Sequence, residues 1–485
     1  VMNTWNAAPP TVQPPAGPET PVDDIQRIFR LQQESKDRVG STSVRERKAR
    51  LKALHQAILK HRPAIKQAMY EDYRKHPAEV DLVEIYPVTA ELKHARRHLA
   101  GWMADHRVPT PLALLGARSR ITYEPKGTVL IISPWNFPVN LTFGPLVSAL
   151  AAGNTVMIKP SELTPRTSAE IGRIVSGVFP ENEVAVIEGG VATSTALLEL
   201  PFNHIFFTGS PAVGKVVMTA AAKHLASVTL ELGGKSPSIV DETADLDIAA
   251  RRIAWSKFVN NGQICITTDH VFVHRTRMEE FIRKVREQVE RFYPGDPVNE
   301  GSYCRMVNTG HFERVKGYVE DAVAAGARVR MGGTFDASQN YMAPTLITDV
   351  PDDSGLMTNE IFGPVLPVIP YSDVNTVIAR INQGQKPLGL YIYSRDRRKI
   401  RHILSRTRAG GSCVNHTAIH FYNPYLPFGG SNNSGIGKGH GRAGFEAFSN
   451  ARAVLTQYMP GPMELLMMPY NGFKQKLIDL TIRYF

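Results

Sequence analysis

Short apolar runs alternate with segments of helical length from about residue 128 onward. We predict buried strands at Thr128–Ser133, Asn154–Ile158, Glu183–Ile187 and His204–Phe207, and helices at Phe143–Ala152 and Ala169–Val178. Strands that alternate with helices are joined by right-handed crossovers. The pattern therefore indicates a parallel sheet of the α/β class.

A second unit of the same kind follows. Its predicted strands are Val228–Leu232 and Ser238–Val240 and the segments near 269–273, 328–331, 366–370 and 390–393, and its predicted helices lie near 246–259, 278–292 and 310–325. At about 150 residues per domain, a chain of 485 residues suggests two or three domains.

The N-terminal part of the chain has a different pattern. Residues 1–22 are rich in proline and poor in apolar residues, which predicts a flexible arm. Residues 23–75 are helical in pattern, with Leu51, Leu54 and Ile58 on one face. The basic residues of this region include Arg47, and we expect them to form a solvated face. Binding of nucleic acid or of a membrane is the alternative, but basic motifs with interleaved aromatic residues are absent.

The C-terminal tail, residues 461–485, contains the basic amphipathic segment FKQKLIDLTIRYF. We predict a helix there and expect it to pack on the body of its own chain. A membrane surface or a partner subunit are the alternatives.

Composition narrows the class of protein. Hydrophobic residues make up 43% and charged residues 21%, which excludes a wholly disordered or collagen-like chain. The net charge of +11 permits attraction to anionic cofactors. We find no apolar run of about 20 residues and no secretory signal pattern at the N-terminus. Three cysteines, an odd and small number, argue against a disulfide framework and favour a reducing, cytoplasmic location.

Cys265 is the first candidate for chemistry. It follows the small and amide residues Asn260, Asn261, Gly262 and Gln263, which suit a tight loop that enters a pocket. A thiol is the strongest side-chain nucleophile near neutral pH. The alternative is a buried structural cysteine.

Glu231 and Asn136 are further candidates. Glu231 ends the strand Val228–Leu232 beside two glycines, where partial burial would raise its pKa toward that of a general base. Its alternative is an ion pair with Lys235. Asn136 lies in a proline-flanked turn, where its amide could donate to a developing oxyanion. The alternative is a cap on the following helix.

Several segments could hold a nucleotide. Gly209–Gly214 follows a strand and opens a helix, the place where backbone N–H groups bind phosphates. Lys159 and Glu162, after another strand, could hydrogen-bond ribose hydroxyls. The Gly-x-Gly-x-x-Gly at Gly439–Gly444 follows no strand, and we interpret it as accidental. We predict no metal site, since the 15 histidines show no His-x-x-x-His or paired-cysteine spacing with companions.

Together these segments resemble the aldehyde dehydrogenase superfamily, over nearly the whole chain from about residue 25. The resemblance is carried by SPWNFP (133–138), KPSE (159–162), FTGSPAVG (207–214), LELGGKSP (230–237), GQIC (262–265), EIFGP (360–364) and PFGG (427–430), in this order and spacing. The segment HGRAGFEAFS (440–449) makes the chain similar to the class 3 and coniferyl aldehyde dehydrogenase branch. The residues Asn432, Asn433 and His416 depart from the commoner pattern.

The resemblance implies roles for the candidate residues. Cys265 would attack the aldehyde, Asn136 and the backbone N–H of Cys265 would hold the oxyanion, and Glu231 would activate the water that hydrolyses the thioester. The implied cofactor is NAD, with NADP as the alternative, and the residues implied to bind it are Trp135, Lys159, Ser161, Glu162, Gly209, Ser210, Gly214, Leu232, Glu360 and Phe362.

The resemblance also implies an organisation. It predicts a Rossmann-type coenzyme domain over 23–231, with part of 435–460 packed nearby, and an α/β catalytic domain over 232–430. Segments 115–127 and 436–460 would form a small β arm for oligomer contact, which implies a homodimer.

The substrate implied is an apolar aldehyde, aliphatic or aromatic, which Tyr86, Phe421 and Tyr422 could line. No nucleic-acid partner is expected. A CoA-acylating aldehyde dehydrogenase and a catalytically silent binding protein on the same fold are the alternatives. Glu231 argues against the first of these, because transfer of an acyl group to CoA needs no activated water.

Overall fold

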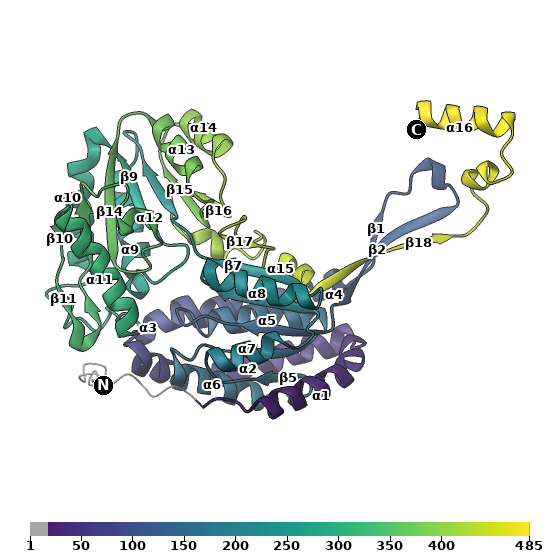
Figure 1. Ribbon diagram of the computed structural model, residues 1–485, viewed down its shortest axis with the longest axis horizontal. Helices are drawn as coiled ribbons and strands as arrows, with labels where there is room; N and C mark the ends of the chain where they lie inside the picture. The colour runs from purple at the N-terminus through teal and green to yellow at the C-terminus, as the bar shows by residue number, and fades with distance from the viewer. Residues whose placement is uncertain (1–17, 485) are drawn as a thin grey trace.

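The computed structural model describes residues 18–484, which form two α/β lobes and a projecting arm (Figure 1). The predicted α/β class is confirmed. Most of the proline-rich segment 1–22 lies outside the described residues. Its described end is attached rather than free, because the Thr20 N–H donates to the Glu188 carbonyl at 2.9 Å.

The first lobe is built on a sheet that has six strands within the described residues, in the order β17-β7-β6-β3-β4-β5. Its strands are β3 (Thr128–Ile132), β4 (Thr155–Lys159), β5 (Val184–Val186), β6 (His204–Gly209), β7 (Ser227–Leu232) and β17 (Gly435–Ile436). All neighbours are parallel except β17, which pairs antiparallel with β7. The central strands are buried on both faces, which explains their unbroken apolar runs.

Helices cover both faces of this sheet. Their bounds are α1 (Val22–Gly40), α2 (Val44–Tyr73), α4 (Tyr86–Met103), α5 (Asn140–Ala152), α6 (Pro165–Ser176), α7 (Val191–Leu198) and α8 (Pro211–Lys223). Apolar residues of α2, α4, α5 and α6 share one core with Val129 and Ile131, whereas those of α1, α7 and α8 share another with Leu130 and Ile132. Alternate residues of β3 therefore serve opposite faces.

The helical region 23–75 is two helices, and one expectation about it is wrong. Leu51, Leu54 and Ile58 are buried, as predicted. Arg47, however, is buried rather than solvated. Its guanidinium donates to the carbonyls of Ala151 at 3.0 Å and Gly40 at 2.6 Å. The hydrogen bonds to backbone oxygens compensate for the lost hydration of the charge.

The second lobe holds a sheet of seven described strands, in the order β10-β13-β14-β9-β8-β15-β16. They are β8 (Pro237–Val240), β9 (His270–His274), β10 (Arg328–Met331), β13 (Thr345–Thr348), β14 (Val365–Tyr371), β15 (Gly389–Tyr393) and β16 (Gly411–Val414), with helices α9 (Leu246–Phe258), α10 (Met278–Phe292), α11 (Thr309–Ala324), α13 (Val374–Gln383) and α14 (Arg397–Arg406). Smaller elements are α3 (Pro77–Val80), α12 (Gly355–Thr358), α15 (Gly441–Ala447), β11 (Phe335–Asp336) and β12 (Tyr341–Met342). The strands of the second sheet lie between residues 237 and 414, whereas the first sheet takes in β17 from near residue 435; the predicted domain boundaries stay a prediction.

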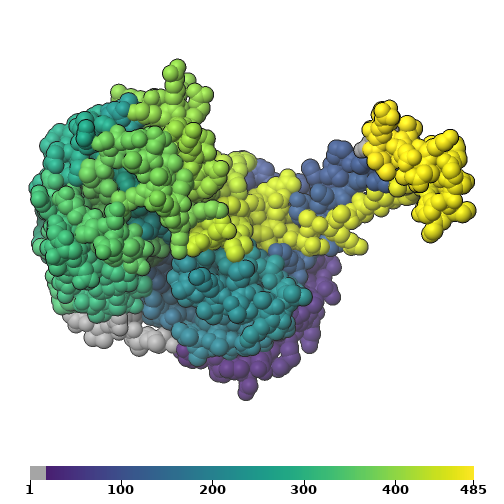
Figure 2. Space-filling view, turned by 45° about the horizontal axis from the view of Figure 1, so that its top comes forward, coloured from purple at the N-terminus to yellow at the C-terminus, as the bar shows by residue number. Residues whose placement is uncertain are grey.

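The arm consists of three antiparallel strands, β1 (His106–Val108), β2 (Ala117–Pro125) and β18 (Ser449–Gln457). It projects from the body and carries the C-terminal segment at its tip (Figure 2). That segment ends in α16 (Gly472–Tyr484), in which no residue is buried. The expectation that this helix packs on the body of its own chain is therefore wrong. Among the described residues, no helix is long and apolar enough to cross a membrane.

Candidate active site

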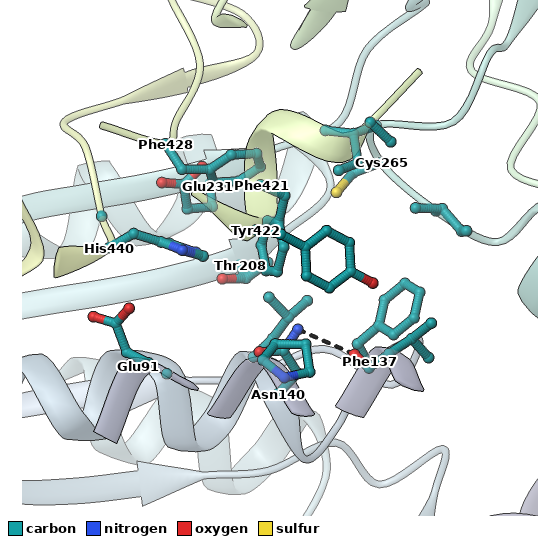
Figure 3. Close-up of a pocket in the computed structure, with 18 of the residues that line it drawn as sticks. Glu91, Phe137, Asn140, Thr208, Glu231, Cys265, Phe421, Tyr422, Phe428 and His440 are labelled. Atoms are coloured by element: carbon teal, nitrogen blue, oxygen red, sulfur yellow. Dashed lines mark hydrogen bonds between the residues drawn. The ribbon is translucent and has the colours of Figure 1, made fainter. Parts of the chain in front are cut away.

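A pocket lies between the carboxyl ends of the strands of the first lobe and the loop that carries Cys265 (Figure 3). Cys265, Glu231 and Thr208 all line it, although they come from three separate segments. Thr208 on β6 and Glu231 on β7 stand opposite each other in the parallel register. The carboxyl ends of parallel strands therefore bring polar groups of distant sequence to the pocket.

A strained loop positions Cys265. Asn260 and Asn261 have φ of 52° and 55°, a left-handed conformation that asparagine tolerates better than most residues. Gly262 also has a positive φ, and a Cβ there would collide with the Gly363 carbonyl, so only glycine fits. Gln263 holds the loop from inside, because its side-chain amide donates to the Arg305 carbonyl at 3.1 Å.

The thiol of Cys265 points into the pocket (Figure 3). Burial raises its pKa to about 12, and the carboxylates of Glu360 and Glu231 add to the rise. The thiol therefore carries its proton at neutral pH, and that proton has to leave when the sulfur attacks.

Glu231 is buried, and neither of its carboxylate oxygens has a hydrogen-bond partner among residues 18–484. Burial raises its pKa well above the usual value, while the Lys438 ammonium opposes the rise. The alternative pairing with Lys235 is wrong, because the Lys235 Nζ lies 2.5 Å from Asp269 Oδ2. Two open oxygens on a base of raised pKa suit the acceptance of a proton from water.

Asn136 is joined to the loop of Cys265. Its Nδ2 donates to the Gln263 carbonyl at 3.0 Å, and its own backbone carbonyl accepts from Asn260 Nδ2 at 3.0 Å. The helix-capping alternative is wrong, because α5 has Val139 at its N-cap and no side-chain cap. An amide has two N–H groups, so Asn136 keeps one for a ligand.

A buried ion pair supports Asn136 from behind. Lys75 Nζ lies 3.1 Å from Glu84 Oε1, and both side chains are wholly buried. Lys75 also donates to the Asn136 carbonyl at 3.4 Å, and Glu84 Oε2 accepts the Asn140 N–H at 2.7 Å. Glu84 belongs to a single π-helical turn, Asp81–Ile85, a feature often found near functional sites. Sequence patterns did not reveal this pair, since its members act only across the folded interior.

The predicted cofactor residues gather at the strand ends of the first lobe. Lys159 is buried, and its Nζ lies 2.7 Å from Glu162 Oε2. Gly209 ends β6, Ser210 caps α8 through the Val213 N–H, and Gly214 lies in the first turn of α8 against Leu232. Ser161 follows Lys159 and accepts a hydrogen bond from the Leu163 N–H at 3.2 Å.

Glu360 comes from the segment that follows α12 in the second lobe. It is packed so closely against Gly233 that a Cβ there would collide with it. Burial raises its pKa to about 8, and its Oε1 has no partner within the described chain. The rings of Trp135 and Phe362 meet edge to face at 5.4 Å.

The walls of the pocket are largely apolar. Phe421 and Tyr422 line it, as predicted from their aromatic character, whereas Tyr86 lies outside the lining with its ring 6.1 Å from Tyr422. Sequence analysis missed most of the other lining residues, which include Phe137, Leu141, Trp255, Val259, Phe428, Glu91 and His440. They come from separate elements and share no motif.

The His-x-x-x-His spacing was overlooked in the sequence, where it occurs three times, at His94/His98, His270/His274 and His416/His420. His94 and His98 form a His-x-x-x-His pair on α4, a spacing known from metal sites. Their ring centroids lie 4.3 Å apart with tilted planes, beside Trp102. Within residues 18–484, no group of three or more His, Cys, Asp or Glu side chains is arranged to hold a metal.

Comparisons with known proteins agree on one family. The model of the aldehyde dehydrogenase family matches residues 16–454. The chain is 40% identical to the dimeric NADP-preferring aldehyde dehydrogenase of Rattus norvegicus, over 86% of this chain and 90% of the rat protein. It is 39% identical to aldehyde dehydrogenase family 3 member B1 of Homo sapiens, over 87% and 89% of the two chains.

The fold has a close counterpart among solved structures. The substrate-bound state of Staphylococcus aureus AldH superposes with a TM-score of 0.90 at 38% identity. The match covers 94% of this chain and 99% of that one.

Proposed function

The chain belongs to the aldehyde dehydrogenase family, and from this premise we propose that its pocket oxidises apolar aldehydes through a covalent bond to Cys265. The family makes it an NAD(P)-dependent enzyme, and its relatives confirm the class 3 branch. The single observation that carries the proposal is the pocket shared by a nucleophilic thiol and an unpaired, buried carboxylate.

The proposed first step takes place on Cys265. Its sulfur attacks the carbonyl carbon and forms a hemithioacetal, and the thiol proton leaves to water in the pocket. The free N–H of Asn136 and the backbone N–H of Cys265 would stabilise the new oxyanion. When this oxyanion collapses to a carbonyl group, a hydride leaves the former aldehyde carbon. The product on Cys265 is a thioester.

The second step is hydrolysis of the thioester. Water attacks the acyl carbon, Glu231 accepts the proton of that water, and the thiol leaves. The apolar pocket walls limit other water, which protects the thioester until this step. The open oxygens of Glu231 support hydrolysis over the CoA-acylating alternative, which needs no such base.

The residues of the cofactor site fit a nicotinamide dinucleotide. The buried, unpartnered Oε1 of Glu360 is an acceptor for a ribose hydroxyl, and the start of α8 at Ser210 offers backbone N–H groups to the pyrophosphate. Lys159 and Glu162 would hold the adenosine ribose. When bound, the nicotinamide ring accepts the hydride.

A panel of aldehydes tests the function and the substrate class together. We expect aliphatic aldehydes of medium length and benzaldehyde to reach a kcat/KM at least about tenfold above that of an aldehyde bearing a carboxylate, because the pocket walls are apolar. The absorbance of reduced nicotinamide reports the rate. A turnover that depends on added CoA would favour the acylating alternative, and no reduction with any aldehyde would contradict the proposal.

Asn136→Ala tests the oxyanion donor. We expect kcat to fall by about 10²–10³, since one donor typically contributes that much. Asn140→Ala is the matched control. Asn140 lines the pocket, but its Nδ2 donates to the Val83 carbonyl at 3.3 Å and not to the loop of Cys265, so we expect less than about a tenfold loss. Equal losses in the two variants would remove Asn136 from this role.

We also propose a homodimer formed through the arm. Large apolar side chains at its tip are exposed, among them Leu465, Phe473 and Ile482, the last at 77%. Exposed apolar surface of this extent favours a protein partner. The name of the rat relative, a dimeric enzyme, supports a second copy of this chain as that partner.

The three free cysteines support the proposal that the protein works in a reducing, cytoplasmic compartment.

A further inference from the structure

Glu19 lies against the N-terminus of α7. Its Oε1 accepts the Gly190 N–H at 2.9 Å, and its other oxygen accepts the hydroxyl of the buried Thr193. These two hydrogen bonds lower the pKa of Glu19, and the one from Thr193 contributes most. The carboxylate is therefore charged at neutral pH. Thr20 fastens the same segment, since its hydroxyl donates to the Glu188 carbonyl at 2.7 Å.

This carboxylate is close to the residues proposed for the adenosine ribose. A Cβ built on Gly190 would lie 3.1 Å from Glu19 Oε1 and 3.9 Å from Glu162 Cγ. The Lys159 ammonium attracts the Glu19 carboxylate as well. The adjacency follows from the sheet. β4 and β5 are parallel neighbours, Lys159 is the last residue of β4, and α7 follows the carboxyl end of β5.

The charge balance at this place is unfavourable to a further anion. The N-terminus of a helix ordinarily attracts phosphate through its free N–H groups. Here Glu19 already occupies the Gly190 N–H. Lys159 is already paired with Glu162 at 2.7 Å, so the three side chains carry a net charge of about −1.

We propose that Glu19 is a cofactor-specificity residue that disfavours a phosphate on the 2′-oxygen of the adenosine ribose and so favours NAD over NADP. The inference rests on the proposed function, in which Lys159 and Glu162 hold that ribose. NADP differs from NAD only by this 2′-phosphate, which carries about two negative charges. A fixed carboxylate nearby repels it, whereas the free hydroxyl of NAD is not repelled.

Calorimetric titration of the full chain with NAD and with NADP, without aldehyde, tests the proposal by binding alone. We expect Glu19→Gln to lower the Kd for NADP by about tenfold, and the Kd for NAD to change by less than about threefold. Glu19→Lys should lower the Kd for NADP further. Glu19 is exposed, so these variants should fold.

Thr20→Val is the matched control, because it loosens the same segment but keeps the charge of Glu19. We expect its ratio of the two Kd values to equal that of the unaltered protein. An unchanged ratio in both Glu19 variants would overturn the inference, as would an equal change in Thr20→Val, which would make Glu19 only an anchor. Failure of the unaltered protein to bind either dinucleotide would instead contradict the proposed function itself.

Discussion

Cys265→Ala should lower kcat for aldehyde oxidation by at least about 10⁴-fold, because the covalent route is lost with the sulfur. Cys265 is the one cysteine in the described pocket lining, and no other side chain there is a comparable nucleophile. The absorbance of reduced nicotinamide measures the loss. The cofactor should still bind, so the Kd for NAD should stay within about threefold.

Cys413→Ala is the control for general effects of removing a thiol. Cys413 is buried, and its sulfur lies 3.3 Å from His420 Nδ1, outside the pocket lining. We expect its kcat to stay within about threefold of the unaltered enzyme. If Cys265→Ala retained more than about a tenth of the activity, the thiol would not be the nucleophile.

Glu231→Gln should separate the two steps of the reaction. We expect the first turnover to release reduced nicotinamide in a burst, and the steady-state rate to fall by about 10²–10⁴, since hydrolysis loses its base. Glu91→Gln is the control, because Glu91 also lines the pocket and burial also raises its pKa, to about 7. Its steady state should fall far less. An unchanged steady state in Glu231→Gln would remove Glu231 as the base.

The pH dependence of the steady state gives the same residue a second test. Burial raises the pKa of Glu231, and only the deprotonated carboxylate can accept a proton from water. The rate of hydrolysis should therefore increase with pH through the raised pKa, above the range of an ordinary carboxylate. Stopped-flow measurements across pH should lose this increase in Glu231→Gln.

The sequence predicted best what depends on continuous burial. The strands β3 and β4 are buried on both faces, so their apolar runs mark them to within a residue. The tail helix α16 was placed wrongly, because an amphipathic pattern indicates an apolar face but not what covers it. Arg47 was misjudged for a similar reason, since its partners are carbonyls that no side-chain pattern reveals.

The same distinction, between features that a sequence pattern marks and features that depend on contacts in the fold, applies to the candidate site. Cys265, Glu231 and Asn136 were found because each lies in a motif that carries the family resemblance, and the structure brings the first two to one pocket. Lys75 and Glu84 were not found, because their pairing arises only when the segment after α2 packs against the π-helical turn behind Asn136. Glu19 lies in a segment without helical or strand periodicity, so no pattern marked it. Its contact with the start of α7 is what places it near the proposed cofactor residues.

Mass spectrometry of the trapped enzyme shows directly whether Cys265 carries the acyl group. Glu231→Gln is mixed with benzaldehyde and NAD, quenched in acid after one turnover, and digested. We expect one benzoyl group, bound as a thioester in the peptide that contains Cys265. A burst of reduced nicotinamide with the acyl group on another residue, or with no covalent adduct at all, would contradict this expectation.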